Sequence, residues 1–185
     1  KKFIFEAKKS IIRQRQLGSD MKTFKEGLKH ILRQDPNVIM VGEMRDLETI
    51  AATMTLAETG HLVLATLHTI NAAQTVDRII DVFPPYQQDQ IRVQLSMSLR
   101  GVISQKLLVK QQGGRVATRE ILLNSSAVAN LIRENKIAQI KTVIQTSAEM
   151  GMVTMDQDIK RLFKEGVITK EMAESNMIDA RTLSV

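Results

Sequence analysis

The chain has 185 residues, enough for one hydrophobic core or for one core and a small additional domain. Apolar residues make up 43% of the chain and aromatic residues only 3%, which is typical of a globular protein without large stacking platforms for single-stranded nucleic acid. The absence of cysteine excludes disulfides and cysteine-ligated zinc and suits a reducing cytoplasm. No apolar run approaches the roughly 20 residues that a membrane-spanning helix needs.

The net charge of +6 is concentrated near the N-terminus. Residues 1–35 hold ten lysines and arginines against four acidic residues, whereas the rest of the chain holds sixteen of each sign. Such a basic segment can bind phosphate, nucleic acid or acidic lipid, but it can equally be a solvated face. The chain starts at Lys1 without a methionine, which we interpret as the start of a fragment or of a processed chain.

The first predicted elements are two short extended segments, 3–5 and 10–13, followed by a helix. The helix is predicted to begin at Thr23, because Thr23 and Glu26 have the spacing of a capping box. Pro36 cannot continue a helix, so the helix is expected to end before it.

Two apolar runs, 38–41 and 62–66, have the length of β-strands. They are continuous rather than alternating, which is typical of parallel strands that are buried on both faces. A helix is predicted between them over 46–59, with Gly60 in the position of a helix-ending glycine.

Two more helices are predicted over 71–82 and 86–99, and a β-hairpin over 102–110 and 116–123. Alternating strands and helices indicate an α/β fold with a parallel sheet. Beyond Ser125 the pattern is helical throughout, with four predicted helices at 127–135, 136–149, 154–165 and 169–176. We therefore expect an α/β domain that is followed by an all-helical domain, with the boundary near residues 111–125.

The first candidate site residue is Glu43, which follows the predicted strand 38–41 and Gly42. Gly42 allows close approach of a ligand, and ligands of open α/β sheets bind at the carboxyl ends of the strands. A carboxylate there could hold Mg²⁺ through water or orient an attacking water. The alternative is a surface glutamate that pairs with Arg45.

The second candidate site contains two histidines: His61 precedes the predicted strand 62–66 and His68 follows it. An imidazole just past a strand end could bond a terminal phosphate. Each histidine could instead make only structural hydrogen bonds. Joint metal binding is a poor explanation, because an extended strand would hold the two roughly 20 Å apart.

Both segments resemble PilT-type motor ATPases of the secretion ATPase superfamily. LRQDPNVIMVGEMRDLETI is similar to the Walker B region of that family, and TGHLVLATLHTINAAQTVDRIIDVFPP to its His box. KKSIIRQRQLG resembles the stretch after the acidic box of the family, and AVANLIRENKIAQI its C-terminal motif. GMVTMDQDIKRLFKEGVITKEMA resembles the helices that follow. The resemblance covers essentially the whole chain.

The resemblance implies part of a RecA-like ATPase core over 1–118 and a helical C-terminal domain over 119–185. It implies a cytoplasmic hexamer at the pilus base, peripheral to the inner membrane and in contact with an inner-membrane platform protein. This hexamer would hydrolyse ATP with Mg²⁺ and couple the hydrolysis to type IV pilus retraction and twitching motility. The resemblance implies that Glu43 and His68 are catalytic and that Glu43 also binds Mg²⁺ through water. The implied nucleotide contacts are Arg15, Arg33, Gly42 and His61.

The chain departs from the family pattern at three points. The phosphate-binding loop is absent, since none of the nine glycines is followed by lysine. Position 16 is Gln where many relatives have Glu, and Ala129 stands where the C-terminal motif has arginine. We therefore expect the chain to be a C-terminal fragment that is catalytically incomplete by itself.

Two alternatives stay open. The chain could belong to a pilus-assembly or type II secretion ATPase, although those commonly carry a tetracysteine zinc insertion, which a chain without cysteine cannot form. The basic first 35 residues could instead indicate a non-enzymatic nucleic-acid-binding or interaction fragment, but no aromatic stackers or helix-turn-helix reader accompany them, and we expect no specific nucleic acid as a partner.

Overall fold

The computed structural model of the chain describes residues 4–184. Packing divides the chain into two compact units, Lys1–Leu67 and His68–Val185. Because these units reflect packing within this chain alone, the predicted division into a core up to residue 118 and a helical domain from residue 119 stays a prediction. Among the described residues, no helix combines the length and the apolar character that crossing a bilayer requires.

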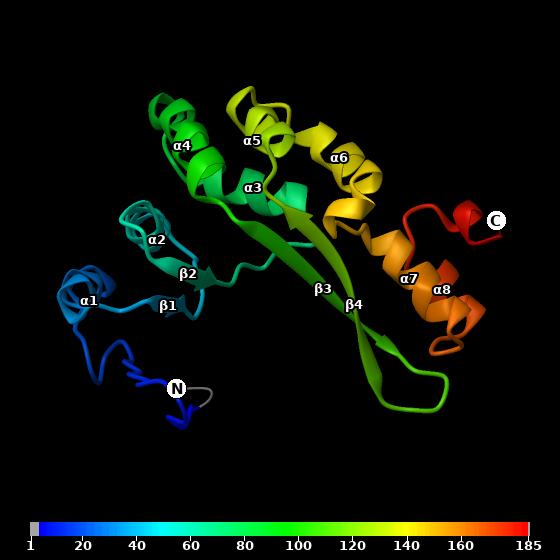
Figure 1. The fold of residues 1–185 in the computed structure, drawn as a ribbon, viewed down its shortest axis with the longest axis horizontal. Helices are drawn as coiled ribbons and strands as arrows, with labels where there is room; N and C mark the ends of the chain where they lie inside the picture. The colour runs from blue at the N-terminus through cyan, green and yellow to red at the C-terminus, as the bar shows by residue number, and fades with distance from the viewer. Residues whose placement is uncertain (1–3, 185) are drawn as a thin grey trace. The chain divides into compact units, whose positions relative to one another are not determined.

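The first unit contains two parallel strands that are connected through a helix (Figure 1). In register, Val38 lies opposite Leu62 and Val41 lies opposite Ala65, which confirms the predicted parallel pairing. In the described part of the segment before the first helix, from residue 4 on, one bridge forms, between Leu17 and Met21. The elements are α1 (Phe24–Ile31), the 3₁₀ turn η1 (Leu32–Gln34), β1 (Val38–Val41), α2 (Leu47–Glu58) and β2 (Leu62–Ala65).

The described residues of the two predicted extended segments, 4–5 and 10–13, do not form strands. Residue 3 lies outside the described residues, and the described residues 4–5 and 10–13 are irregular. A strand needs a partner for its backbone groups, and neither segment pairs with β1 or β2, whose partners are each other.

Local sequence signals set the helix ends of the first unit. The Thr23 hydroxyl accepts the backbone N–H of Glu26 at 3.1 Å, so the first half of the predicted capping box is formed. Asp46 caps α2 in the same way, accepting the N–H of Thr49 at 2.8 Å. Gly60 has a φ of +94°, which a residue with a side chain rarely adopts, and this confirms its predicted role after α2.

The expectation that both strands are buried on two faces is wrong within this chain. Ile39 and Val41 of β1 pack with Leu28 and Leu56 in a small buried cluster, but alternate residues of the strand point away from it. A two-stranded sheet with helices on one side leaves its other face open. The apolar side chains on that face are 49–61% exposed, and they are Val38, Met40, Leu62 and Leu64.

The second unit begins with two helices, continues with a long antiparallel hairpin and ends in a series of short helices (Figure 1). Its first elements are α3 (Ala72–Asp81), α4 (Pro85–Ser98), β3 (Gly101–Val109) and β4 (Arg115–Leu123). The later elements are α5 (Ser126–Arg133), η2 (Ile137–Gln139), α6 (Ile140–Thr146), η3 (Ala148–Met150), α7 (Met155–Lys164), α8 (Lys170–Glu174) and η4 (Ala180–Ser184).

The hairpin confirms the prediction to within one residue at the strand ends. Gly101 pairs with Leu123 at its base and Val109 with Arg115 next to the turn. The turn contains Gly113 and Gly114 at φ values of +84° and +75°, a backbone conformation that glycine adopts without steric cost.

The helical character beyond Ser125 is confirmed, with one correction. The single helix predicted over 136–149 is instead the turn η2, the helix α6 and the turn η3. Asn135 follows the end of α5 at a φ of +56°, a left-handed conformation that commonly terminates a helix. Val153 also makes one antiparallel bridge to Ile121, which attaches this segment to the hairpin.

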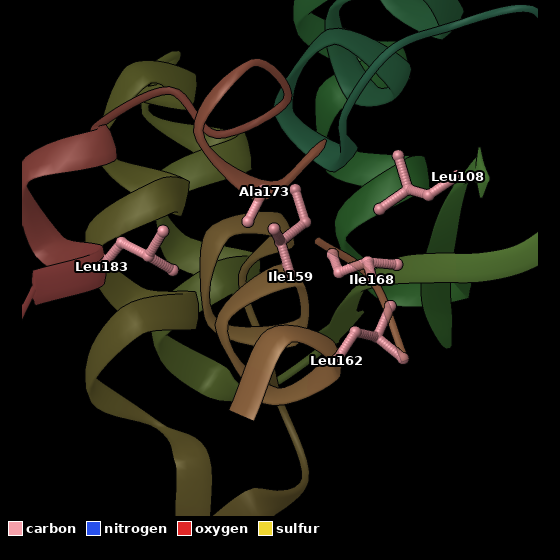
Figure 2. Packing of buried hydrophobic residues seen from close by; sticks show 6 residues of the cluster. All are labelled: Leu108, Ile159, Leu162, Ile168, Ala173 and Leu183. Atoms are coloured by element: carbon pink, nitrogen blue, oxygen red, sulfur yellow. The ribbon is translucent and has the colours of Figure 1, made fainter. Parts of the chain in front are cut away.

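The hairpin and the last helices of the second unit share a hydrophobic core (Figure 2). Leu108 from β3 packs with residues of α7, the following turn, α8 and η4, all of them at most 7% exposed. The partners of Leu108 are Ile159, Leu162, Ile168, Ala173 and Leu183. Side chains that lie far apart in sequence therefore hold the hairpin and the C-terminal helices together.

A buried carboxylate also connects the hairpin to α7. Asp158, 7% exposed, accepts the hydroxyl of Thr118 at 3.0 Å and the N–H of Arg119 at 2.9 Å. Arg161, one turn further along α7, donates to the same carboxylate at 2.7 Å. Asp158 is thus a buried charge with several hydrogen-bond partners, as buried charges require.

Candidate functional site

The carboxyl ends of β1 and β2 are held together by backbone and hydroxyl groups. Because the strands are parallel and in register, Gly42 and Thr66 each follow a strand at the same edge of the sheet. The Thr66 hydroxyl donates to the carbonyl of Gly42, and the N–H of Met44 donates to the carbonyl of Thr66 at 2.9 Å. The turn that carries Glu43 is therefore fixed beside the end of β2.

Glu43 lies at this edge and contacts Arg45. Its side chain is 21% exposed, and its Oε1 lies 2.7 Å from Nε of Arg45, whose side chain is 74% exposed. The interaction with the carboxylate raises the pKa of Arg45 above its usual value. The pairing that the sequence left open as an alternative is thus formed, and the catalytic role of Glu43 stays a prediction.

The edge can contribute to a Mg²⁺ site without forming a complete one. The described residues contain no group of three or more His, Asp or Glu side chains that could hold a metal. Mg²⁺ keeps several waters and is usually bound by one or two carboxylates together with substrate phosphates. One carboxylate, Glu43, fits this requirement, so Mg²⁺ would be held mainly by water and phosphate.

Gly42 is exposed, and a Cβ added to it would meet no atom within 4 Å. Space is thus present in front of the strand end, as the prediction of a nucleotide contact requires. Arg15 and Arg33 are both exposed, Arg15 in the irregular segment before α1 and Arg33 in η1. Their predicted phosphate contacts stay predictions.

His61 lies at the opposite end of β2 from Thr66. Its Nδ1 is 3.0 Å from the hydroxyl of Thr59 and 3.1 Å from the carbonyl of Leu56. The imidazole therefore bonds the C-terminal end of α2, which is the structural role that the sequence left open. The structure does not bring His61 to the edge that carries Glu43, and its predicted nucleotide contact stays a prediction.

His68 is exposed and opens the second unit, in the loop before α3. Side chains of the first turn of α3 hold this loop. The Thr69 and Thr75 hydroxyls lie 2.7 Å apart, and the N–H of Ile70 donates to Oε1 of Gln74 at 2.8 Å. The position of His68 thus depends on the position of the N-terminal end of α3.

Two residues that support these positions were missed from the sequence. Thr66 could have been found by aligning the two apolar runs, since parallel strands in register place Gly42 and Thr66 side by side. Glu120 of β4, which is only 6% exposed, accepts the N–H of Ala72 at the start of α3. The signal for Glu120 was its position between Thr118 and Leu122, which places an acidic side chain on the buried face of the strand.

Comparisons with known proteins identify the family of the chain. Residues 5–111 match the family described as Type II/IV secretion system protein. The chain is 50% identical over 171 residues to the Type IV pilus retractation ATPase PilT of Pseudomonas aeruginosa, covering 92% of the chain and 50% of the relative. It is 51% identical over 183 residues to a twitching motility protein of Neisseria gonorrhoeae, covering 98% of the chain and 49% of the relative.

A crystal structure of the pilus retraction motor PilT with bound ADP matches with a TM-score of 0.87 and 48% identity, covering 98% of this chain and 51% of that one. This likeness confirms the predicted fold class, a RecA-like α/β core followed by helices. The chain spans about half the length of the curated relatives that it matches. The chain belongs to the type II/IV secretion system protein family, and within that family its similarity is to the PilT-type ATPases.

Proposed function

We propose that this chain is part of a motor ATPase that couples ATP hydrolysis to type IV pilus retraction, and so to twitching motility. One observation carries the proposal: the likeness to a retraction motor with bound ADP extends over 98% of the chain, at 48% identity. The likeness thus includes the C-terminal helices as well as the α/β part of the chain.

In this proposal Glu43 acts on Mg²⁺ or on the attacking water, and ATP is the substrate. Phosphoryl transfer to water is catalysed by positioning and by charge stabilisation. A carboxylate in a turn that Thr66 and Met44 hold in place suits that task. His68 would bond the terminal phosphate. Arg15, Arg33 and Gly42 would contact the nucleotide.

The chain by itself would bind ATP weakly and would not hydrolyse it. A phosphate-binding loop supplies backbone N–H groups and a lysine to the β- and γ-phosphates, and the 185 residues contain no such loop. Titration calorimetry of the chain with Mg-ATP at physiological salt tests this statement. A micromolar dissociation constant, or turnover above that of a Glu43→Gln control, would contradict it.

The assembly is also proposed rather than observed. We infer a homo-hexamer at the cytoplasmic side of the inner membrane, in contact with a membrane platform protein at the pilus base. The support is the resemblance of the whole chain to PilT-type ATPases. Analytical ultracentrifugation of a full-length ATPase that contains this sequence would check the hexamer.

The central test replaces Glu43 by Gln in a full-length ATPase that contains this sequence. We expect ATP hydrolysis to fall by at least about a hundredfold while nucleotide binding persists, because the lost charge matters more in the transition state than in the ground state. Glu48→Gln, the same change on an exposed residue of α2, is the matched control and should keep full activity. Unchanged turnover in Glu43→Gln would make Glu43 a structural partner of Arg45.

A second test separates retraction from pilus assembly and type II secretion. The full-length ATPase should restore twitching motility to cells that lack their retraction ATPase, and its Glu43→Gln variant should not. Restored piliation or secretion without twitching would assign the chain to one of the alternative classes instead.

A further inference from the structure

The inference concerns Glu120, a buried acidic residue in the middle of β4. Its side chain is 6% exposed, and its Oε1 accepts the N–H of Ala72, the first residue of α3, at 2.8 Å. The two residues are 48 positions apart in sequence. An ionised side chain is rarely found at this depth unless a specific partner offsets the loss of hydration.

The partner is the N-terminal end of a helix. The first N–H groups of a helix have no acceptor within the helix, and the helix dipole favours negative charge at that end. Asn71 provides a second acceptor at the same end, since its side chain accepts the N–H of Gln74 at 2.8 Å. Glu120 therefore fixes the start of α3 to the hairpin.

The start of α3 in turn holds the loop that carries His68. Gln74, in the first turn, accepts the N–H of Ile70, and Thr75 contacts the hydroxyl of Thr69. A series of short contacts thus leads from β4 through α3 to the residue after His68. All of these groups lie in the second unit.

We propose that Glu120 is a positioning residue for His68, and that its carboxylate occupies the anion-binding end of α3. The part of this inference that concerns catalysis rests on the proposed function of His68. Because a carboxylate already neutralises this helix end, phosphate is not bound there, and the imidazole of His68 is the group of this loop that meets the terminal phosphate.

The first experiment measures position rather than activity and uses the chain itself. In Glu120→Ala, amide exchange at Ala72 should accelerate about tenfold to a hundredfold, as expected for the loss of a hydrogen bond to a charged group. The NMR resonances of the His68 ring should shift. Glu120→Gln keeps an oxygen that can accept from Ala72, so it should restore most of the protection and the His68 resonances.

Asp158→Ala is the matched control, because Asp158 is equally buried and also bonds β4, but it connects the hairpin to α7. It should lower the stability of the second unit and leave the His68 resonances unchanged. If Glu120→Ala and Asp158→Ala have the same effect on Ala72 and His68, Glu120 is a structural residue only and the proposal is wrong.

The same chain tests the anion-binding part with inorganic phosphate. Phosphate should shift the Ala72 amide resonance in Glu120→Ala, in which the helix end is vacated, and not in the wild-type chain. A shift of equal size in the wild-type chain would show that Glu120 does not occupy the site.

Kinetics of a full-length ATPase that contains this sequence complete the test. Glu120→Ala should lower kcat about tenfold or more with little change in KM for ATP, and Glu120→Gln should recover most of the loss. When His68 is already replaced by Ala, adding Glu120→Ala should lower kcat no further. Full activity of His68→Ala would refute the proposed role of His68, whereas the exchange and NMR measurements would still decide whether Glu120 positions the loop.

Discussion

The two units of the chain differ in how completely they bury their apolar residues. In the first unit a small cluster around Ile39 and Val41 is buried, while the opposite face of the same two strands is about half exposed. In the second unit one face of the hairpin is buried, with Leu108 and Leu122 at most 2% exposed, and Ile140 is fully buried. On the other face of β3, Ile103, Leu107 and Val109 are 54–64% exposed.

The units thus differ in the depth of their buried side and not in the exposed strand face, which both of them have. Burial of apolar area is the main favourable term in folding, and the second unit obtains it from its own hairpin and helices. Each unit also presents an apolar strand face that is about half exposed, of a kind that is usually covered by other structure. The following predictions test this comparison with matched changes in the two units.

The largest effect is expected for leucine truncation in the two sheets. Leu122→Ala in β4 removes a fully buried side chain and should destabilise the second unit by about 2–5 kcal/mol. Leu64→Ala in β2, where the side chain is 51% exposed, should cost less than about 1 kcal/mol. Native-state hydrogen exchange reports each unit separately. Equal losses would show that the face of β2 is covered in solution.

The ion pairs of the two units provide the second comparison. Asp158→Ala leaves Thr118, Arg119 and Arg161 without their shared acceptor and should cost about 1.5–3 kcal/mol. Arg45→Ala breaks the exposed pair with Glu43 and should not measurably change the unfolding free energy. Urea unfolding followed by circular dichroism measures both. A large loss in Arg45→Ala would mean that the pair holds the turn after β1.

Helix capping provides a third, smaller comparison with identical chemistry. Thr154 makes a complete capping box with Gln157 at the start of α7, whereas Thr23 accepts only the N–H of Glu26. Thr154→Ala should cost about 1 kcal/mol, and Thr23→Ala, at an exposed helix end, a few tenths. Thermal unfolding of the two variants ranks them, and the reverse ranking would contradict the comparison.

The smallest effect is expected from a charge on α3. Partial desolvation raises the pKa of Asp77, and the charge of Asp81 adds to the shift while Arg92 opposes it. An acid whose pKa is higher in the folded state than its unfolded value of 3.8 lowers the free energy of unfolding once it ionises. This destabilisation is absent below pH 3.8 and grows as the pH rises through the folded-state pKa.

Asp77→Asn removes that cost. Its melting temperature should equal that of the wild-type chain near pH 3.5 and exceed it slightly at pH 7. Asp81→Asn should have a weaker effect in the same direction, since Asp81 is only the second cause of the shift. A lower melting temperature of Asp77→Asn at pH 7 would show that the attraction of Arg92 outweighs desolvation.

Only part of the candidate site could be read from the sequence. The sequence located Glu43 after a strand and His68 after the next, because strand ends are marked by local composition. It did not decide whether Glu43 pairs with Arg45 or contacts a ligand. In this structure Glu43 pairs with Arg45, at 2.7 Å. Nor did it show that His61 bonds the end of α2.

The sequence by itself determined the elements and their order, because caps, turn glycines and apolar periodicity act over a few residues. Thr23, Gly60 and the hairpin turn at Gly113 are examples. Only the tertiary structure decided which residues meet: Thr66 with Gly42, Asp158 with Thr118, and Glu120 with Ala72. These contacts join segments 24 to 48 residues apart, and their formation depends on how the elements pack, which local sequence patterns do not encode.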